Sequence, residues 1–99
     1  MVALLSEFVV APGKTDLVCA AVDIPSSADC ACVQTIIASY ADAPRRVFVL
    51  HVFAGDRDAT RFHEDVLPGL VQSVRLHIDL AVPLRKMNIA ANTAAALVA

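Results

Sequence analysis

Two histidines are the side chains best suited to acid–base chemistry in this sequence. His51 interrupts the apolar segment from Val47 to Phe53, and His63 follows Phe62 in a stretch with helical spacing. A histidine titrates near neutral pH and can act as a general base. Such a base could deprotonate a weakly acidic hydroxyl group such as that of a phenol or an enol.

Each histidine also has a purely structural explanation. Burying the His51 imidazole costs free energy unless the ring finds a partner. A neutral ring hydrogen-bonded to Ser6 or Gln34 on a neighbouring strand would meet that need, and His63 could equally be an exposed helix residue beside Glu64. For each histidine the sequence therefore supports two roles, a base in a pocket and a residue with a purely structural role.

Glu7 is a further polar residue inside an apolar segment, from Val2 to Val10. It could be a pocket acid with a raised pKa, because burial disfavours the charged form of a carboxyl group. We favour an ion pair instead, with Arg85 or Lys86 on an adjacent last strand.

Motifs for phosphate, nucleophilic or metal chemistry are missing from the sequence. It has no glycine-rich phosphate loop, no Ser-His-Asp order with an elbow motif and no His-Glu-x-x-His. The segment Asp56-Arg57-Asp58 lacks the later ligands of a calcium loop, and Cys30-x-Cys32 offers too few ligands for a closed zinc site. We therefore predict no metal site and no cofactor.

Composition restricts the partners that the chain can have. Of its 99 residues, 58% are apolar, which is more apolar surface than a small monomer easily hides and predicts self-association. The net charge of −2 gives no cationic surface for nucleic acid. Neither a signal peptide nor an apolar run of about 18 residues is present, so we expect a cytoplasmic protein without membrane contact.

Apolar patterning predicts one α+β domain over residues 1–91. Segments with β-branched residues or alternation predict strands at residues 2–10, 32–40, 46–53 and 82–89. Helical spacing predicts a short helix that Thr15 or Asp16 caps and Pro25 stops. A second helical stretch should start at Asp56 or Asp58 and divide at Pro68 into pieces that end near Leu67 and Leu80.

The predicted order β-α-β-β-α-β is the ferredoxin-like arrangement with a four-stranded antiparallel sheet. Its helices cover one face only, yet the strands carry apolar residues on both faces. A second copy of the same sheet is the simplest cover for the other face, which predicts a homodimer. Residues 92–99 form a small apolar tail that could add a helix against a second subunit or be disordered.

Three segments resemble the antibiotic biosynthesis monooxygenase family of dimeric α/β barrels: VALLSEFVVAPGK, RVFVLHVFAGDRDATRFHEDV and VPLRKMNI. The resemblance implies a dimeric α/β barrel with a pocket between each subunit's sheet and helices. It also implies a monooxygenase-like activity without metal or flavin on a small aromatic or quinone-type ligand. In that pocket His51 and His63 would be catalytic, and the substrate would contact the residues Ser6, Glu7, Phe53 and Phe62.

The chain departs from that family at two of these positions. His51 stands where many members have glutamate, and Phe53 stands where they often have tryptophan. No tryptophan occurs anywhere in the chain, so a mechanism that needs an indole cannot operate. The alternative is a non-catalytic domain of the same fold that binds a small molecule or serves dimeric assembly.

Overall fold

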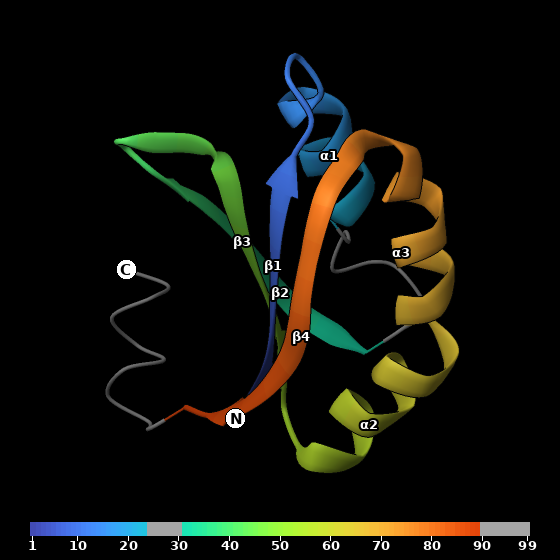
Figure 1. The fold of residues 1–99 in the computed structure, drawn as a ribbon. Coiled ribbons are helices and arrows are strands. Elements are labelled where there is room, and N and C mark those ends of the chain that lie inside the picture. Colours follow the sequence, from blue (N-terminus) through green and yellow to red (C-terminus); the bar gives the residue numbers. More distant parts are fainter. Residues whose placement is uncertain (24–30, 90–99) are drawn as a thin grey trace.

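A four-stranded antiparallel sheet with helices along one face makes up the described part of the chain (Figure 1). The computed structural model describes residues 1–23 and 31–89. The predicted helix stop at Pro25, the cysteine at position 30 and the predicted tail from residue 92 lie outside these residues.

The elements follow the predicted order β-α-β-β-α-β, with the second helix in two pieces. The strands are β1 (Val2–Val10), β2 (Cys32–Tyr40), β3 (Ala43–Phe53) and β4 (Ile78–Asn88), and the sheet order is β2-β3-β1-β4. The helices are α1 (Thr15–Val22), α2 (Asp56–Asp65) and α3 (Leu67–Val74), followed by a 3-10 turn at Arg75–His77. The ferredoxin-like fold is confirmed, and so is the edge position of the last strand.

Strand β4 begins at Ile78, four residues before the predicted Val82, in a segment that we assigned to a helix. Its first residues pair with the end of β1, where Val10 lies opposite Ile78. The backbone N–H of Ala11 also donates to the carbonyl of His77 at 2.9 Å. This pairing provides hydrogen-bond partners for the backbone N–H and C=O groups of the segment. Strand pairing of this kind overrides a local preference for helix.

The predicted side-chain caps of the helices are wrong. Lys14 and Gly55 occupy the N-cap positions of α1 and α2, and neither helix has a side-chain cap hydrogen bond. Asp16 and Asp56 lie instead in the first turns, where a negative charge interacts favourably with the helix dipole. Before α1, Gly13 adopts a φ of +76° that other residues rarely accept.

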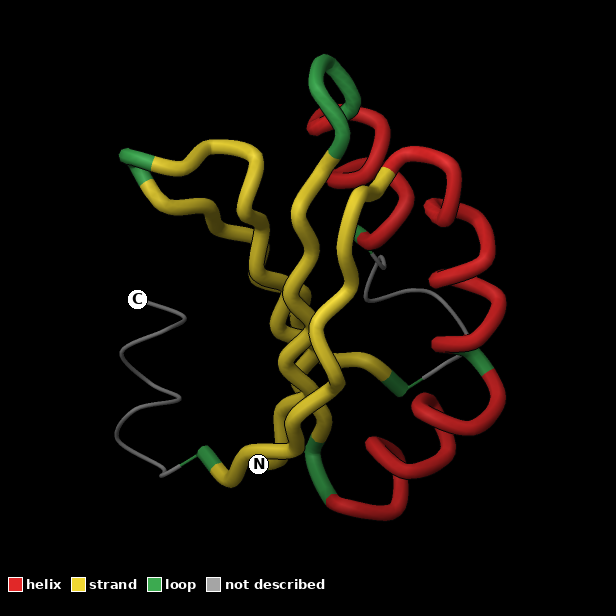
Figure 2. Tube along the Cα trace, in the orientation of Figure 1, coloured by secondary structure: helices red, strands yellow, loops and turns green. Residues whose placement is uncertain are grey.

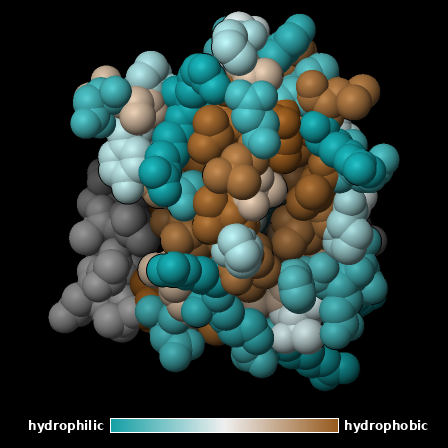
Figure 3. Space-filling view, in the orientation of Figure 1, coloured by the Kyte–Doolittle hydropathy of each residue, from teal (hydrophilic) through white to brown (hydrophobic). Residues whose placement is uncertain are grey.

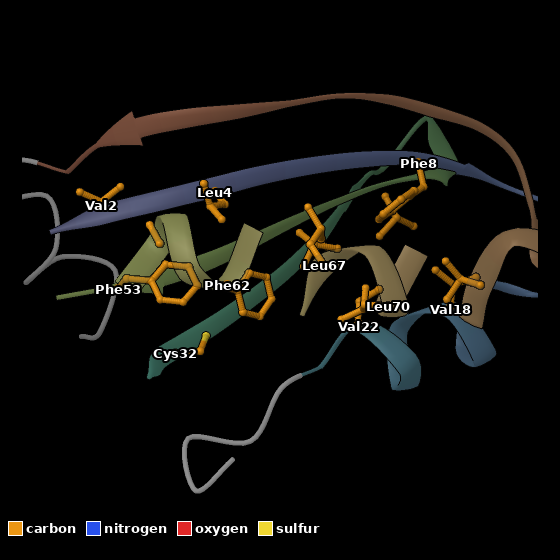
Figure 4. Packing of buried hydrophobic residues seen from close by; sticks show 14 of the residues in the cluster. Val2, Leu4, Phe8, Val18, Val22, Cys32, Phe53, Phe62, Leu67 and Leu70 are labelled. Carbon is orange, nitrogen blue, oxygen red and sulfur yellow. The ribbon is translucent and has the colours of Figure 1, made fainter. Parts of the chain in front are cut away.

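The hydrophobic core fills the space between the sheet and the helices, which lie on one side of the strands in Figure 2. Figure 4 shows the Phe53 ring on the sheet beside the Phe62 ring on α2. The principal residues of this layer are Leu4, Phe8, Val18, Val22, Val49, Phe53, Phe62, Leu70 and Val74.

The opposite face of the sheet carries partly exposed apolar side chains, and no helix of the described residues covers it. Leu5, Phe48 and Leu50 lie on this face and are half-buried. On edge strand β4, Leu80 is 57% exposed, and apolar side chains gather in the region of that strand in Figure 3. The apolar side chains on this face agree with the sequence pattern, which predicts apolar residues on both faces of the strands.

Within residues 1–23 and 31–89, no helix is both long enough and apolar enough to cross a membrane.

Candidate functional site

His51 lies in β3 on the face that meets the helices, and it is 1% exposed. Its Nε2 atom is 2.9 Å from the carbonyl oxygen of Val22, the last residue of α1. The prediction that Ser6 or Gln34 is the hydrogen-bond partner of this nitrogen is therefore wrong. Since a carbonyl oxygen only accepts hydrogen bonds, the neutral ring carries its proton on Nε2, and Nδ1 holds an unprotonated lone pair.

The surroundings of His51 keep its ring neutral. Burial lowers the pKa of His51 from its usual value, while the hydrogen bond to Val22 and the charge of Asp23 oppose this shift. At neutral pH the imidazole is therefore uncharged. A neutral ring with a defined tautomer is the form that can accept a proton.

Three buried side-chain atoms have no hydrogen-bond partner among the described residues: Ser6 Oγ, His51 Nδ1 and, in the 3-10 turn before β4, His77 Nδ1. Of these, Ser6 and His51 lie on neighbouring strands. Leu4 of β1 pairs with His51 of β3, and Ser6 is the next residue of β1 on the same face. The two residues are thus diagonal neighbours across two strands. A buried polar group without a partner costs about 1–3 kcal/mol, so a pair of them calls for an explanation.

Aromatic rings border His51 on its apolar side. The centroid of the Phe62 ring is 4.8 Å from that of His51 and 5.1 Å from that of Phe53. The structure therefore brings together four of the predicted site residues between the sheet and the helices. We call this group the interlayer site; it consists of Ser6, His51, Phe53 and Phe62.

The other two predicted residues lie elsewhere. His63 is exposed on α2, because it follows Phe62, which is turned into the core. Glu7 lies on the opposite face of the sheet, one residue along β1 from Ser6. Neither residue is part of the interlayer site.

Glu7 does form an ion pair, but its partner is not Arg85 or Lys86 as we expected. Its Oε1 atom is 2.7 Å from Nε of Arg46 on β3. Lys86 instead donates to Asp56 at 2.7 Å and so joins β4 to α2. The predicted partner was wrong because β1 lies between β3 and β4. Both of these strands carry basic residues, and the one that pairs with Glu7 lies on β3.

A hollow of about 250 Å³ lies beside this ion pair on the uncovered face of the sheet. Sequence reasoning missed it, although the alternation of β3 places Arg46 and Phe48 on one face. We call it the sheet-face hollow. Its lining residues include Leu5, Glu7, Tyr40, Arg46, Phe48 and Arg85. A second, more open hollow lies over α2 and is lined in part by Arg57, Thr60 and Arg61.

No three His, Cys, Asp or Glu side chains form a metal-binding group within the part of the chain that the structure describes. Burial and the nearby Asp16 raise the pKa of the Cys19 thiol, which disfavours the thiolate.

Known proteins resemble this chain in fold and not in sequence. No protein-family model matches it, and neither does any curated protein. Among solved structures, a protein of Deinococcus radiodurans that is assigned as an antibiotic biosynthesis monooxygenase aligns with a TM-score of 0.70. The two are 5% identical, and the alignment covers 91% of this chain and 93% of that one.

Two further structures give the same picture. A protein of Chloroflexus aurantiacus with the same assignment has a TM-score of 0.67 at 12% identity, over 90% of this chain and 92% of that chain. The protein SO0527 of Shewanella oneidensis has a TM-score of 0.66 at 20% identity, over 87% of each chain. The predicted resemblance to the antibiotic biosynthesis monooxygenases is thus confirmed for the fold.

The His51→Gln substitution should change how stability depends on pH. In the wild type, the unfolded chain takes up a proton at His51 below about pH 6.5, whereas the folded chain resists protonation because the pKa is lowered. The free energy of unfolding therefore falls with decreasing pH from about 6.5, by at most about 1.4 kcal/mol per unit, until the folded-state pKa is reached. Glutamine can still donate to the Val22 carbonyl but does not titrate.

Urea unfolding of both proteins between about pH 7 and pH 5 measures this difference. His63, His77 and the carboxylates are common to both proteins, so the difference between the two pH profiles isolates His51. Equal slopes for wild type and His51→Gln would contradict the assignment of a lowered pKa.

Proposed function

We propose that the interlayer site binds a small aromatic or quinone-type compound and that the protein is a monooxygenase-like enzyme that works without a cofactor. The observation that carries the proposal is the pair of buried atoms without partners, His51 Nδ1 and Ser6 Oγ. A phenol hydroxyl can donate to the nitrogen while its oxygen accepts from the serine hydroxyl. One ligand group would therefore satisfy both atoms.

The surroundings of the two polar atoms suit an aromatic ligand. Phe53 and Phe62 lie in ring contact with each other, and Phe62 also contacts the imidazole. Aromatic rings prefer offset or edge-to-face contacts at such centroid distances, and these contacts stabilise a bound ring beyond the burial of its area.

In this proposal His51 acts as the general base. Nδ1 takes the phenol proton, and dioxygen bonds to the para carbon of the phenolate. The imidazolium then returns its proton to the outer peroxide oxygen. Finally, Nδ1 removes the remaining proton from that carbon, the O–O bond breaks, and hydroxide leaves with this proton as water. The substrate gives four electrons to O₂, and the products are a quinone and one water.

The packing of the layer supports a second candidate, a small-molecule-binding or dimeric assembly domain without chemistry. His51 is 1% exposed, and its ring already contacts Phe62. A histidine held in this way also fits a purely structural role, in which its bond to Val22 fastens α1 to the sheet.

Oxygen consumption with 1-naphthol distinguishes the two candidates. We expect the wild type to consume one O₂ for each naphthoquinone formed. His51→Gln should lower the rate by about 10²- to 10⁴-fold, the range for loss of a general base. His77→Gln is the matched control, since His77 lies in the 3-10 turn before β4. No oxygen uptake by the wild type, or equal rates in His51→Gln, would contradict the enzyme proposal.

His63 remains a predicted catalytic residue, and the same assay tests it. Because its side chain is exposed on α2, the reaction proposed above does not use it. A rate loss in His63→Gln comparable to that of His51→Gln would therefore contradict our assignment of a single base, while an unchanged rate would remove His63 from the mechanism.

We also propose that two copies pair through the uncovered faces of their sheets. The face carries half-buried apolar residues, among them Leu5, Phe48 and Leu50, which a second copy would remove from water. Burying apolar surface contributes roughly 25 cal/mol per Å², and paired sheets of a homodimer resemble a protein core.

The substitution Leu50→Glu should convert the dimer to a monomer, because it places a charge in the middle of this face. Size-exclusion chromatography with light scattering should give twice the chain mass of 10.5 kDa for the wild type and a single chain mass for the variant. Leu17→Glu is the control, because Leu17 is 54% exposed on α1. A monomeric wild type would refute the proposed pairing, as would a dimeric Leu50→Glu variant.

A further inference from the structure

Strand β2 brings a third polar side chain to the face of the sheet that carries His51. Thr35 of β2 pairs directly with His51 of β3, and residues paired in this way point to the same face with Cβ atoms about 5 Å apart. Ile37, two residues further along β2, packs against the core, so this face of β2 meets the helices. Thr35 is half-buried and therefore borders the interlayer site at the edge of the sheet.

Thr35 and Ser6 flank His51 from opposite sides. The sheet order β2-β3-β1 places them on the two strands next to that of His51. Thr35 is level with His51, whereas Ser6 is two residues along β1 from Leu4, which pairs with His51 on that side. Strands lie about 4.8 Å apart and rise about 3.4 Å per residue, so the Cα atoms of Ser6 and Thr35 are roughly 12 Å apart. His51 lies between them on β3.

This separation selects the arrangement of oxygens on a ligand. Two hydrogen bonds of about 2.8 Å take up part of the distance and leave roughly 6 Å between two ligand oxygens. Ortho and meta oxygens of a benzene ring are closer together than this, and para oxygens come nearest to it. A ring with two para oxygens can therefore reach both hydroxyl groups while one of its edges faces His51.

The Thr35 hydroxyl group can exchange a weak contact for a ligand oxygen. Its Oγ1 atom is 3.8 Å from Sγ of Cys32, and either atom could be the donor. Sulfur is a weak donor and a weak acceptor, whereas a hydroxyl group rotates and offers one donor and two lone pairs. A ligand oxygen accepts more strongly than sulfur and can therefore compete for the hydroxyl proton.

The buried polar groups of this face are uncharged. Ser6 and His51 are the only buried polar or charged side chains among the described residues, and burial lowers the pKa of the imidazole. A carboxylate or phosphate placed beside them would lose its hydration without a compensating charge. The ligand oxygens should therefore be neutral, as in hydroxyl, ether or carbonyl groups.

We propose that Thr35 determines the specificity of the interlayer site by donating a hydrogen bond to a ligand oxygen para to the hydroxyl group that contacts Ser6 and His51. The inference rests on the ligand binding proposed for that site, and it makes a ring with two para oxygens the favoured ligand. In the proposed reaction the para carbon receives oxygen, so Thr35 holds the second oxygen of the quinone product. His51 lies between the two ends, beside both the hydroxyl group and this carbon.

Two phenols of similar size test the proposal by NMR titration of the ¹⁵N-labelled protein without oxygen. The compound para-methoxyphenol has the second oxygen, and para-ethylphenol has a CH₂ group in its place. Because the two phenols also differ in hydrophobicity, the measured quantity is the ratio of their Kd values, para-ethylphenol over para-methoxyphenol, compared between protein variants. We expect both phenols to shift the amide signals of Ser6, Thr35 and His51 in the wild type.

Three substitutions isolate the hydroxyl group. Thr35→Val replaces it with a methyl group and should lower the Kd ratio about threefold to tenfold, as for loss of one hydrogen bond, while para-ethylphenol binds as in the wild type. Thr35→Ser keeps the hydroxyl group and should keep the wild-type ratio. Thr60→Val is the matched control, since Thr60 contacts Lys86 at 3.3 Å outside the interlayer site, and it should also keep the ratio.

The outcomes separate this inference from the proposed function. An equal ratio in the wild type and Thr35→Val, with both phenols bound, would overturn the role of Thr35 and leave the proposed function standing. A lowered ratio in Thr35→Ser would do the same, and so would loss of both phenols in Thr35→Val, because the residue would then be structural. If neither phenol binds to the wild type, the proposed ligand site and this inference are both wrong.

Discussion

The hydrogen bond from His51 Nε2 to the Val22 carbonyl is the contact on which the rest of the interior depends. It joins β3, two residues before the end of that strand, to the last residue of α1 at 2.9 Å. It also satisfies one polar atom of a residue that is 1% exposed, and the free energy cost of that burial would otherwise oppose the fold. Because the carbonyl can only accept, the same bond leaves Nδ1 as a lone pair beside Ser6.

The sheet separates two environments that have different chemistry. On the helix side, Ser6 and His51 are buried, the imidazole contacts the Phe62 ring, and burial lowers the pKa of the histidine. On the other side, the charges of Glu7 and Arg46 pair at 2.7 Å beside half-buried apolar residues. Neighbouring residues of β1, Ser6 and Glu7, thus serve opposite faces, because side chains alternate along a strand.

The fold could be predicted largely from the sequence, whereas the contacts of the polar residues could not. Runs of β-branched residues placed β2 at its observed bounds, and Pro68 correctly divided the second helix. The partner of His51 is a backbone carbonyl, which no side-chain pattern reveals. The partner of Glu7 depended on which neighbouring strand supplies the basic residue, and the register of β4 places Arg85 opposite Leu5 and not opposite Glu7.

The central claim is that His51 is a neutral base with a free Nδ1, and ¹⁵N NMR of its imidazole tests this most directly. The account predicts an Nε2-protonated neutral ring at pH 7, with a coupled proton on Nε2 and an unprotonated Nδ1 whose shift changes when 1-naphthol is added. A ring protonated on Nδ1, or an Nδ1 signal that does not respond to the ligand, would contradict it.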